Sequence, residues 1–535
     1  KNIKAKTGST VYNSYNTLVN QQQKHTPLKI KEENIRLIFG VKVKQLRSEK
    51  KLSLAEVSKA TGISVSYLNE IEKGKKYPKP NKIAALAQTL EVDYDWLISL
   101  QLSKKLAPIA ELIQSDMLTS LPLEIFGIEL STLIDMITNT PAKVSAFIST
   151  LIEISRNYDM SVERFYFSVL RSYQEMHENY FEDLEKAAEA FSKEHQLTSL
   201  PLTVEQFETL LKETYGYTID RESILEYPAL KSQRSVFVRK AKVGGRLLMN
   251  PNLTESQQLF TLGKELGYNY LKLQNRLYTS STVKVSSFEQ LLNNFKASYF
   301  ANALLMPANH FVTEIKKAIA STQWQESVFL SLLDQYQVSP EMFLHRLTNL
   351  IPRFFGLKQL FFLRFHHAKV TDEYELNKEL HLAGLYNPHG NMLNEHYCRR
   401  WVSINILKDL EKAQSGQLDL ATQKAHSNGV ICSAQRSQYI DSENEYLCIS
   451  LARTINPTPN TNSSVTIGFL MTKEFKKKVK FWNDEAIPVR RVGVACERCT
   501  NMDCQERAAE PLTVTEKNTT DEMQEALDAM QERWG

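Results

Sequence analysis

Apolar and polar positions follow a helical period in several short segments between residues 35 and 100. Gly62, which follows Thr61, suits a turn that needs a positive φ, and Ser53 and Ser64 can each cap the helix that comes next. The pattern therefore predicts an all-α domain centred on a helix-turn-helix. The expected helices are Ile35 to Lys50, Leu54 to Ala60, Val65 to Lys73, Asn81 to Leu90 and Tyr94 to Leu100.

The third of these helices has one apolar and one polar face. Its apolar face is expected to pack in the core, and the core residues are Leu68 and Ile71 with Val57, Ala60 and Ile63. Its polar face and the lysines that follow suit a DNA major groove flanked by phosphates. A helical hairpin with a solvated basic edge would have the same composition. The candidate DNA contacts are Lys44, Arg47, Ser53, Ser64, Val65, Ser66, Tyr67, Asn69, Glu70, Lys73, Lys75 and Lys76.

A longer apolar stripe follows between Ser161 and Gln196, in a stretch without proline or glycine. Its apolar residues recur at intervals of three or four, which predicts one straight helix of roughly 50 Å at about 1.5 Å per residue. Such a helix would be a dimer stalk or would pack on the next domain, and residues 101–200 are expected to be a helical connector. A homodimer or higher homo-oligomer is expected, because this kind of DNA-binding domain usually reads paired half-sites.

Length and charge limit the possible organisation of the rest of the chain. With 535 residues the chain is too long for one hydrophobic core, and about three or four domains are expected. The net charge is only +4, but no acidic residue precedes Glu32, so residues 1–30 are expected to be a disordered basic tail. No apolar run is long enough for a membrane span and no signal peptide is evident, so we expect a cytoplasmic, nucleoid-associated protein without membrane contact.

Residues 201–366 are expected to form a separate α+β domain, with strands at Ser235 to Arg239 and Arg246 to Asn250. Two stretches stand out: Q-L-F-T-L-G-K-E-L-G-Y, which ends at Tyr268, and F-A-N-A-L-L-M-P, which ends at Pro307. They resemble the ImmA/IrrE-type metallopeptidase domain, whose pattern is F-x-L-A-H-E-L-G-H followed by E-A-x-x-F-A-x-x-L-L-M-P.

The resemblance does not extend to the zinc ligands. In that family two histidines at i and i+4 hold zinc and the glutamate between them acts as general base. Here Lys264 and Tyr268 stand at the histidine positions, Lys296 stands at the third ligand position, and only Glu265 remains. A lysine ammonium does not ligate a metal at neutral pH, so we expect an inactive pseudo-peptidase without catalytic residues. An active peptidase would need other ligands, and the candidates are His310, His366 and His367.

Residues 367–512 mix strand and helix patterns and contain a group of cysteines. Cys496 and Cys499 have the C-x-x-C spacing that lets two sulfurs reach one ion, and Cys504 follows after a short loop. Three thiolates leave a tetrahedral zinc site or an iron–sulfur cluster one ligand short. Strands are predicted at Tyr446 to Ala452 and Val465 to Leu470, and Cys448 is expected to lie in the core.

Three stretches of this region resemble the C-terminal domain of short-chain fatty acyl-CoA regulators: C-R-R-W at Cys398, L-A-R-T-I at Leu451, and the cysteine-rich segment from Val492 to Ala508. The family pattern is C-x-x-W, then A-R-T-V, then I-G-x-x-C-R-x-C-x-R-x-D-C-x-x-R-A-x-P. Glu497 replaces an arginine of that pattern. The resemblance implies a short-chain acyl-CoA effector, and the candidate partners of its phosphates are Arg399, Arg400 and Arg453.

The same resemblance implies that Cys398 is the fourth thiolate beside Cys496, Cys499 and Cys504, with Cys432 as the alternative. Both zinc and a [4Fe–4S] cluster fit four sulfurs, and cysteine spacing does not choose between them.

The segment from Gly62 to Gly74, G-I-S-V-S-Y-L-N-E-I-E-K-G, resembles the XRE family of phage-repressor-like DNA-binding domains, although Leu54 replaces the glutamine usual there. The three resemblances in this order imply a non-enzymatic bacterial transcriptional regulator that binds double-stranded DNA and senses a metabolite. The alternatives are a redox or iron sensor and a DNA-targeted zinc metallopeptidase.

The expected fold is multidomain, mainly α plus α+β. Its expected parts are a basic tail 1–30, an XRE domain 31–100, a connector 101–200, a pseudo-peptidase domain 201–366, a cysteine-site α+β sensor domain 367–512 and an acidic tail 513–535 that holds a helix from Thr520 to Trp534.

Overall fold

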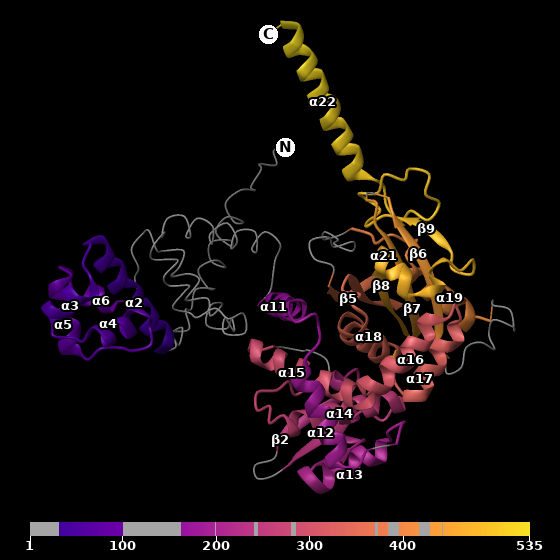
Figure 1. Ribbon diagram of the computed structural model, residues 1–535, viewed down its shortest axis with the longest axis horizontal. Coiled ribbons are helices and arrows are strands. Elements are labelled where there is room, and N and C mark those ends of the chain that lie inside the picture. Colours follow the sequence, from indigo (N-terminus) through magenta and orange to yellow (C-terminus); the bar gives the residue numbers. More distant parts are fainter. Residues whose placement is uncertain are drawn as a thin grey trace, which may run out of the picture. The chain divides into compact units, whose positions relative to one another are not determined.

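The chain divides into two compact units, with the boundary at Val162 and Glu163. The computed structural model (Figure 1) describes residues 32–99, 162–197, 199–239, 244–279, 285–369, 373–382, 395–416, 429–440, 442–458 and 460–534. The predicted basic tail and most of the predicted connector therefore lie outside the described residues. A helical N-terminal domain and mixed α/β content in the C-terminal part agree with the multidomain fold that the sequence predicts.

The helices predicted in the first unit are confirmed. Ser53 caps the second of them: its Oγ accepts from Glu56 N at 3.2 Å, while the Glu56 carboxylate accepts from Ser53 N at 2.7 Å. Gly62 has a φ of +70°, as the predicted turn requires. The elements are α2 (Glu32–Glu49), α3 (Leu54–Thr61), α4 (Val65–Glu72), α5 (Pro80–Thr89) and α6 (Tyr94–Ile98).

The core of the first unit contains most of the predicted residues, since Val57, Ile63, Leu68 and Ile71 are all buried. Ala60 is exposed, so its predicted place in the core is wrong. The inward stripe of α3 runs through Leu54, Val57 and Thr61, which leaves Ala60 on the solvent side of that stripe.

The single helix predicted from Ser161 to Gln196 is wrong, because α11 (Val162–Met176) and α12 (Glu182–Glu194) are separate. Glu178 and Asn179 between them have positive φ angles of 51° and 54°. Asn179 is fully buried, and its Nδ2 donates to Thr348 Oγ1 at 2.8 Å. The break therefore serves packing within the second unit, in which α12 also contacts α15.

The next part of the second unit places a small sheet beside a group of helices. The sheet has the order β1-β3-β2, with β1 parallel and β2 antiparallel to β3, and both predicted strands are confirmed. Helices α14 and α15 approach closely, since a Cβ on Gly267 would lie 3.1 Å from Ala297 O. The elements are α13 (Val204–Tyr215), β1 (Thr218–Asp220), the 3₁₀ turns Ser223–Glu226 and Pro228–Leu230, β2 (Ser235–Arg239), β3 (Gly245–Met249), α14 (Glu255–Tyr270), α15 (Phe288–Leu305), α16 (Ala308–Ala320), α17 (Glu326–Tyr336) and α18 (Pro340–Phe355).

The remainder of the unit is built on a six-stranded sheet of order β5-β4-β8-β7-β6-β9. All neighbours are antiparallel except β6 and β9, which are parallel. The predicted strands at Tyr446 and Val465 are confirmed. The elements are β4 (Leu360–Ala368), β5 (Tyr374–His381), α19 (Val402–Gln414), β6 (Ile431–Tyr439), β7 (Glu445–Thr454), β8 (Thr461–Leu470), α21 (Lys473–Lys478), the 3₁₀ turn Lys480–Asn483, β9 (Val489–Val492) and α22 (Leu512–Trp534).

The two faces of this sheet have different neighbours. One face packs on α19, and Phe361, Leu363 and Phe365 of β4 belong to that core. Because side chains alternate along a strand, Arg364 and His366 of β4 point to the opposite face, which α18 contacts. This second face therefore adjoins the helices of the preceding part of the unit.

The last helix, α22, begins at Leu512 rather than at the predicted Thr520, and none of its residues is buried (Figure 1). The helix is therefore two turns longer than predicted, at the end that follows the cysteine-rich loop. Of the helices in the described ranges, none combines the length and the apolar composition that crossing a bilayer would require.

Candidate functional site

Helix α4 presents a polar surface at the edge of the first unit. Ser66 and Asn69 are exposed, Val65 is 44% exposed, and Glu70 is half-buried. The opposite side of the helix buries Leu68 in the core. Helix α4 therefore has one buried apolar face and one exposed polar face, as predicted.

The N-terminus of α4 is fixed by a serine cap. Ser64 Oγ accepts from Tyr67 N at 3.3 Å, which orients the first turn of the helix. Tyr67 is held in turn, because Lys82 Nζ lies 4.4 Å from the centre of its ring and its hydroxyl donates to Tyr77 O at 3.4 Å. The outer face of α4 is therefore a preformed surface.

Two predicted DNA contacts have roles within the fold. The Arg47 guanidinium binds Glu72 in a bidentate ion pair, with distances of 2.6 and 2.9 Å, and it also donates to Leu52 O at 2.9 Å. This pair joins α2 to α4. Lys44 is half-buried beside it, where burial lowers its pKa and the Glu72 charge opposes that effect. The Arg47 side chain therefore positions α4 within the domain.

The lysines after α4 are open to solvent. Lys75 and Lys76 are exposed, as is Lys79 before α5, whereas Lys73 is half-buried. The backbone N–H groups of Lys75 and Lys76 bond Glu70 O at 2.9 and 3.3 Å, so the segment turns back on the helix. The basic edge predicted from the sequence thus lies at the C-terminal end of α4.

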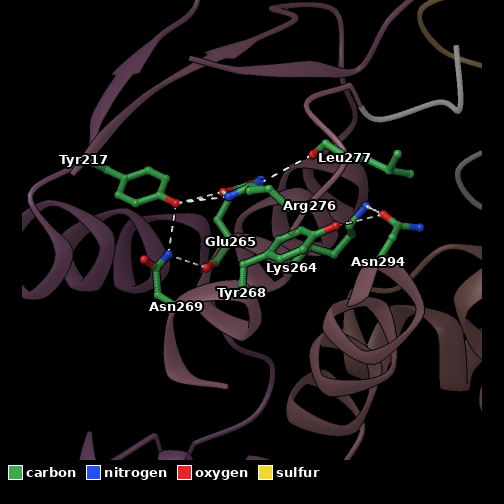
Figure 2. Close-up of polar contacts among 8 residues, drawn as sticks. All are labelled: Tyr217, Lys264, Glu265, Tyr268, Asn269, Arg276, Leu277 and Asn294. Carbon is green, nitrogen blue, oxygen red and sulfur yellow. Dashed lines mark hydrogen bonds and ion pairs between the residues drawn. The ribbon is translucent and has the colours of Figure 1, made fainter. Parts of the chain in front are cut away.

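In the second unit, Lys264 and Tyr268 lie one turn apart on α14 and share one acceptor (Figure 2). Lys264 Nζ donates to Asn294 Oδ1 at 2.8 Å, and Tyr268 OH donates to the same atom at 3.2 Å. Burial lowers the pKa of Lys264 to about 8. An ammonium, a phenol and an amide are not the donor set of a zinc site, so these residues do not fit that metal.

Glu265 belongs to a buried network of its own (Figure 2). Arg276 donates to its two carboxylate oxygens at 2.5 and 2.8 Å, and Tyr217 OH donates to Oε2 at 2.9 Å. Burial disfavours the Arg276 charge, but the adjoining Glu265 outweighs burial and raises its pKa. Asn269 Nδ2 completes the network by donating to Tyr217 OH at 2.9 Å. Both oxygens of the Glu265 carboxylate therefore accept hydrogen bonds from these residues.

The histidines considered as alternative ligands are engaged separately. His310 Nδ1 lies 2.6 Å from Tyr336 OH, and His367 bonds Glu373 O and Glu411 through its two ring nitrogens. His366 points to the α18 face of the sheet, where burial lowers its pKa to about 4. Lys296, at the third ligand position, is half-buried on α15. Sequence reasoning missed Asn294 and Arg276, which carry no family motif.

Three of the predicted cysteine ligands are neighbours. A short antiparallel pairing places Cys398 beside Cys496: Tyr397 pairs with Ala495, and Cys496 N donates to His396 O at 2.8 Å. Burial raises the pKa of the Cys398 thiol to about 11, and the charges of Cys496 and Cys499 act in the same direction. Cys504 is half-buried at the end of the loop.

The loop that carries these cysteines has contacts suited to sulfur. Ala508 N donates to Cys496 Sγ at 3.3 Å, and a Cβ on Gly493 would lie only 2.9 Å from Cys499 Sγ. Arg507 donates to the carbonyl oxygens of Cys496, Cys499 and Asn501. The donor type fits a thiolate-bound ion. However, within the part of the chain described here, no three His, Cys, Asp or Glu side chains form a group that could hold a metal.

The other two cysteines lie elsewhere. Cys448 is in the core beneath α19, as predicted. Cys432 on β6 is opposite Leu451 of β7, and it lies on the sheet face away from that core. Burial raises the pKa of its thiol there, and the charge of Glu326 on α17 adds to that effect. This position separates Cys432 from Cys398.

The three arginines predicted to bind the phosphates of an acyl-CoA do not form one group. Arg399 is buried and its guanidinium stacks 4.4 Å from the centre of the Tyr374 ring, on the α19 face of the sheet. Arg400 lies 3.7 Å from Glu506. Arg453 on β7 points to the opposite face, because it is paired through Ser463 with His366.

Comparisons with known proteins locate two domains. Residues 40–102 match the family model of a "Helix-turn-helix domain", and residues 224–348 match that of an "IrrE N-terminal-like domain". The HTH-type transcriptional repressor RghR of Bacillus subtilis is 36% identical over 61 residues, which are 11% of this chain and 45% of the repressor. The chain thus spans about half the length of that curated relative.

A solved structure, a transcriptional regulator of Mycobacterium tuberculosis, aligns with 64% of this chain and 93% of its own, with 16% identity and a TM-score of 0.43. The two family matches enclose the α3–α4 turn and the Lys264–Glu265 segment described above. The chain therefore joins an XRE-type helix-turn-helix domain to an IrrE-like domain.

Proposed function

We propose that the chain is a sequence-specific DNA-binding transcriptional regulator that acts as a homodimer or higher homo-oligomer. The observation that carries this proposal is the capped α3–turn–α4 segment, whose exposed polar face ends in exposed lysines. In this kind of domain the second helix enters the major groove and the first crosses the backbone. Ser66 and Asn69 would then face base edges, and Lys75 and Lys76 would face phosphates.

Binding of the full chain to fragments selected from genomic DNA tests the proposal. The double variant Lys75→Gln/Lys76→Gln should bind all sequences more weakly, and the slope of log K against log salt should flatten by about 0.9 for each phosphate that is no longer neutralised. Ser66→Ala and Asn69→Ala should instead change the preferred sequence. The matched control is Lys316→Gln/Lys317→Gln, at two exposed lysines of α16, which should change neither. Unaltered binding after loss of residues 35–100 would refute the proposal.

The IrrE-like domain is proposed to act without peptidase chemistry. The support is the donor set at the family's zinc positions, Lys264 and Tyr268 on Asn294, together with the engagement of Glu265 by Arg276. A general base must be free to accept a proton from water, and this carboxylate is bound to a guanidinium. Cleavage of a partner protein that is lost in Glu265→Gln but kept in Asn269→Ser would refute it.

The effector is proposed to be a short-chain acyl-CoA that changes DNA affinity. The support is the resemblance to acyl-CoA regulators together with Arg400, which lies 3.7 Å from Glu506 of the cysteine loop and would suit a phosphate group, since guanidinium groups bind phosphate in a bidentate manner. Calorimetry with acetyl-, propionyl- and butyryl-CoA on the folded full chain tests this. Absence of heat with all three would refute the acyl-CoA proposal and leave DNA binding untouched.

A second function, redox or iron sensing, is favoured by the backbone pairing that places Cys398 beside Cys496. We propose that these two thiols, with those of Cys499 and Cys504, hold zinc or a [4Fe–4S] cluster, with the sulfurs as ligands. Purification without oxygen, followed by iron, sulfide and zinc analysis, shows whether the site holds zinc or an iron–sulfur cluster. Cys398→Ser should lose the metal and Cys432→Ser should retain it. A folded protein that contains neither metal and has six titratable thiols would refute the site.

A further inference from the structure

Helix α22 carries an apolar stripe that no part of the described chain covers. Met523, Leu527, Met530 and Trp534 are between 50% and 71% exposed, although side chains of these types are stabilised by burial. Of the described residues of α22, none is buried (Figure 1). A helix in a folded protein owes most of its stability to the packing of one face, so we expect a further surface to cover this stripe.

The stripe has the spacing of a coiled-coil seam. Its residues follow one another at intervals of four, three and four, which is the alternation of a and d positions in a heptad repeat. Met523 and Met530 then occupy d positions, and Leu527 and Trp534 occupy a positions. Glu516 takes the d position one heptad before Met523, so the apolar seam lies between that glutamate and Trp534.

The carboxylates beside this seam lie on the side of α22 away from the stripe. They stand at the b, c and f positions of the same heptad, which face outward in a two-stranded coiled coil. The e and g positions that flank the stripe hold the uncharged Gln524, Gln531 and Ala526, and the cation Arg533. Two copies of α22 can therefore bring their stripes together without placing carboxylate against carboxylate. The outward carboxylates are Asp521, Glu522, Glu525, Asp528 and Glu532.

This distribution of charge favours a second copy of the chain as the partner. A contact between identical surfaces needs a face that is complementary to itself, and an apolar stripe with mostly neutral flanks meets that need. An anionic membrane surface or an acidic protein would be repelled by the outward carboxylates. A basic partner would contact those carboxylates and leave the stripe exposed.

The base of α22 is held on the cysteine loop. Thr513 N donates to Glu497 O at 3.2 Å, and Val514 N donates to Pro511 O at 3.1 Å. Met523 comes ten residues after Thr513, roughly 15 Å along the helix axis at about 1.5 Å per residue. The stripe is therefore separated from the loop to which the helix is attached.

We propose that α22 is a dimerisation helix, whose stripe pairs with the same stripe of α22 in a second copy of the chain. The inference rests on the proposed regulatory function, because it specifies the surface through which the homo-oligomer forms. The long helix expected as a possible dimer stalk is instead broken at Asn179, which packs within the second unit. Pairing of α22 joins two chains and so supplies two DNA-binding domains to one duplex, as the reading of paired half-sites requires.

Sedimentation velocity of the full chain without DNA, over a range of concentrations, tests the contact. Leu527→Glu/Met530→Glu places like charges across the seam and should raise the dimer dissociation constant about tenfold or more. The matched control Asn518→Glu/Ala529→Glu adds the same charge at outward f and c positions and should leave the constant unchanged. Because α22 has no buried residue, both variants should keep the folded domains, which near-ultraviolet circular dichroism checks.

A charge-reversed variant distinguishes pairing between two α22 helices from docking of α22 elsewhere on a second copy. Leu527→Lys/Met530→Lys should also fail to pair with itself, but an equimolar mixture with Leu527→Glu/Met530→Glu should restore the dimer, because opposite charges then face each other. A mixture that stays monomeric would overturn the proposal. So would wild-type protein that is monomeric at every concentration, or a Leu527→Glu/Met530→Glu variant that associates as wild type does.

DNA binding measured on fragments with one and with two half-sites separates this proposal from that of the regulator. Leu527→Glu/Met530→Glu should lose affinity for paired half-sites and keep its affinity for a single half-site. Wild-type protein that binds DNA but does not associate through the stripe refutes the dimerisation helix alone. Wild-type protein that associates through the stripe but binds no DNA refutes the proposed regulator and leaves the pairing of α22 in place.

Discussion

Two lysines, one in each unit, have different surroundings. Lys42 of α2 is fully buried, and its ammonium donates to Trp96 O at 2.6 Å, Ser99 O at 2.6 Å and Ser99 Oγ at 3.1 Å. Lys264 of α14 has a single acceptor among the described residues, Asn294 Oδ1 at 2.8 Å, and cations nearby. Burial lowers the pKa of both to about 8.

The difference shows that burial of a charge does not define its role. All three ammonium protons of Lys42 have acceptors, so Lys42 ties α2 to the end of α6 and stabilises the fold. Lys264 lacks such acceptors within the described part of the chain and sits where the IrrE family has a metal ligand. We interpret the first as structural, whereas the second has only one of the three acceptors that an ammonium can use.

The largest expected effect comes from the neighbour of Lys264. Glu265→Leu leaves the Arg276 guanidinium buried without its carboxylate and should destabilise the second unit by about 3–5 kcal/mol. Urea unfolding monitored by near-ultraviolet circular dichroism measures the loss. The double variant Glu265→Leu/Arg276→Leu should recover part of it. A loss below about 1 kcal/mol would show that the network contributes little.

Removal of the first lysine should have the next largest effect. Lys42→Met leaves the carbonyl oxygens of Trp96 and Ser99 short of a donor and should destabilise the first unit by about 2–3 kcal/mol. It also removes the ammonium that lies 4.4 Å from the centre of the Trp96 ring. Thermal unfolding followed by tryptophan fluorescence measures this. An unchanged midpoint would contradict the structural role given to Lys42.

The second lysine should behave in the opposite way. Lys264→Met removes an ammonium whose charge burial disfavours, while Tyr268 still donates to Asn294, so stability should change by less than about 1 kcal/mol, in the stabilising direction. Calorimetric scans of wild type and variant at pH 7 provide the measurement. A loss comparable to that of Lys42→Met would erase the distinction between the two lysines.

The smallest expected effect is on pH dependence. The folded-state pKa of Lys264 is about 8 and its ordinary value is 10.5, so above pH 8 the unfolded chain binds more protons than the folded one. The cost of this lysine is therefore fully present below about pH 8 and fades as the pH rises toward 10.5. The stability difference between Lys264→Met and wild type should shrink between pH 7 and pH 10. A constant difference would contradict the lowered pKa.

Local sequence signals predicted the first unit well. Ser53, Ser64 and Gly62 each act through bonds or angles within a few residues, and helix limits that depend on such signals can be inferred from sequence. The apolar period between Ser161 and Gln196 correctly predicted helical structure, which α11 and α12 supply. It did not predict the break at Asn179, because the partner of that amide, Thr348, belongs to another helix far along the chain.

The candidate sites were less predictable for the same reason. Sequence positions alone gave Lys264 and Tyr268 at the family's zinc positions, since that pattern lies within one helix. They could not give Arg276 as the partner of Glu265, which depends on the path of a loop. Arg364 and His366 did carry a signal, as polar residues at alternate positions of an apolar strand, but only the sheet register aligns Arg453 with His366 across β8.

Arg507 gives the cysteine loop an unusual property. One guanidinium binds the carbonyl oxygens of Cys496 and Cys499, at 2.6 and 3.0 Å, and that of Asn501 at 2.7 Å. The path of the backbone is therefore set by the protein's own positive charge. If the proposed metal binds these thiols, it does not need to order the chain, so little of its binding free energy would be lost as conformational entropy.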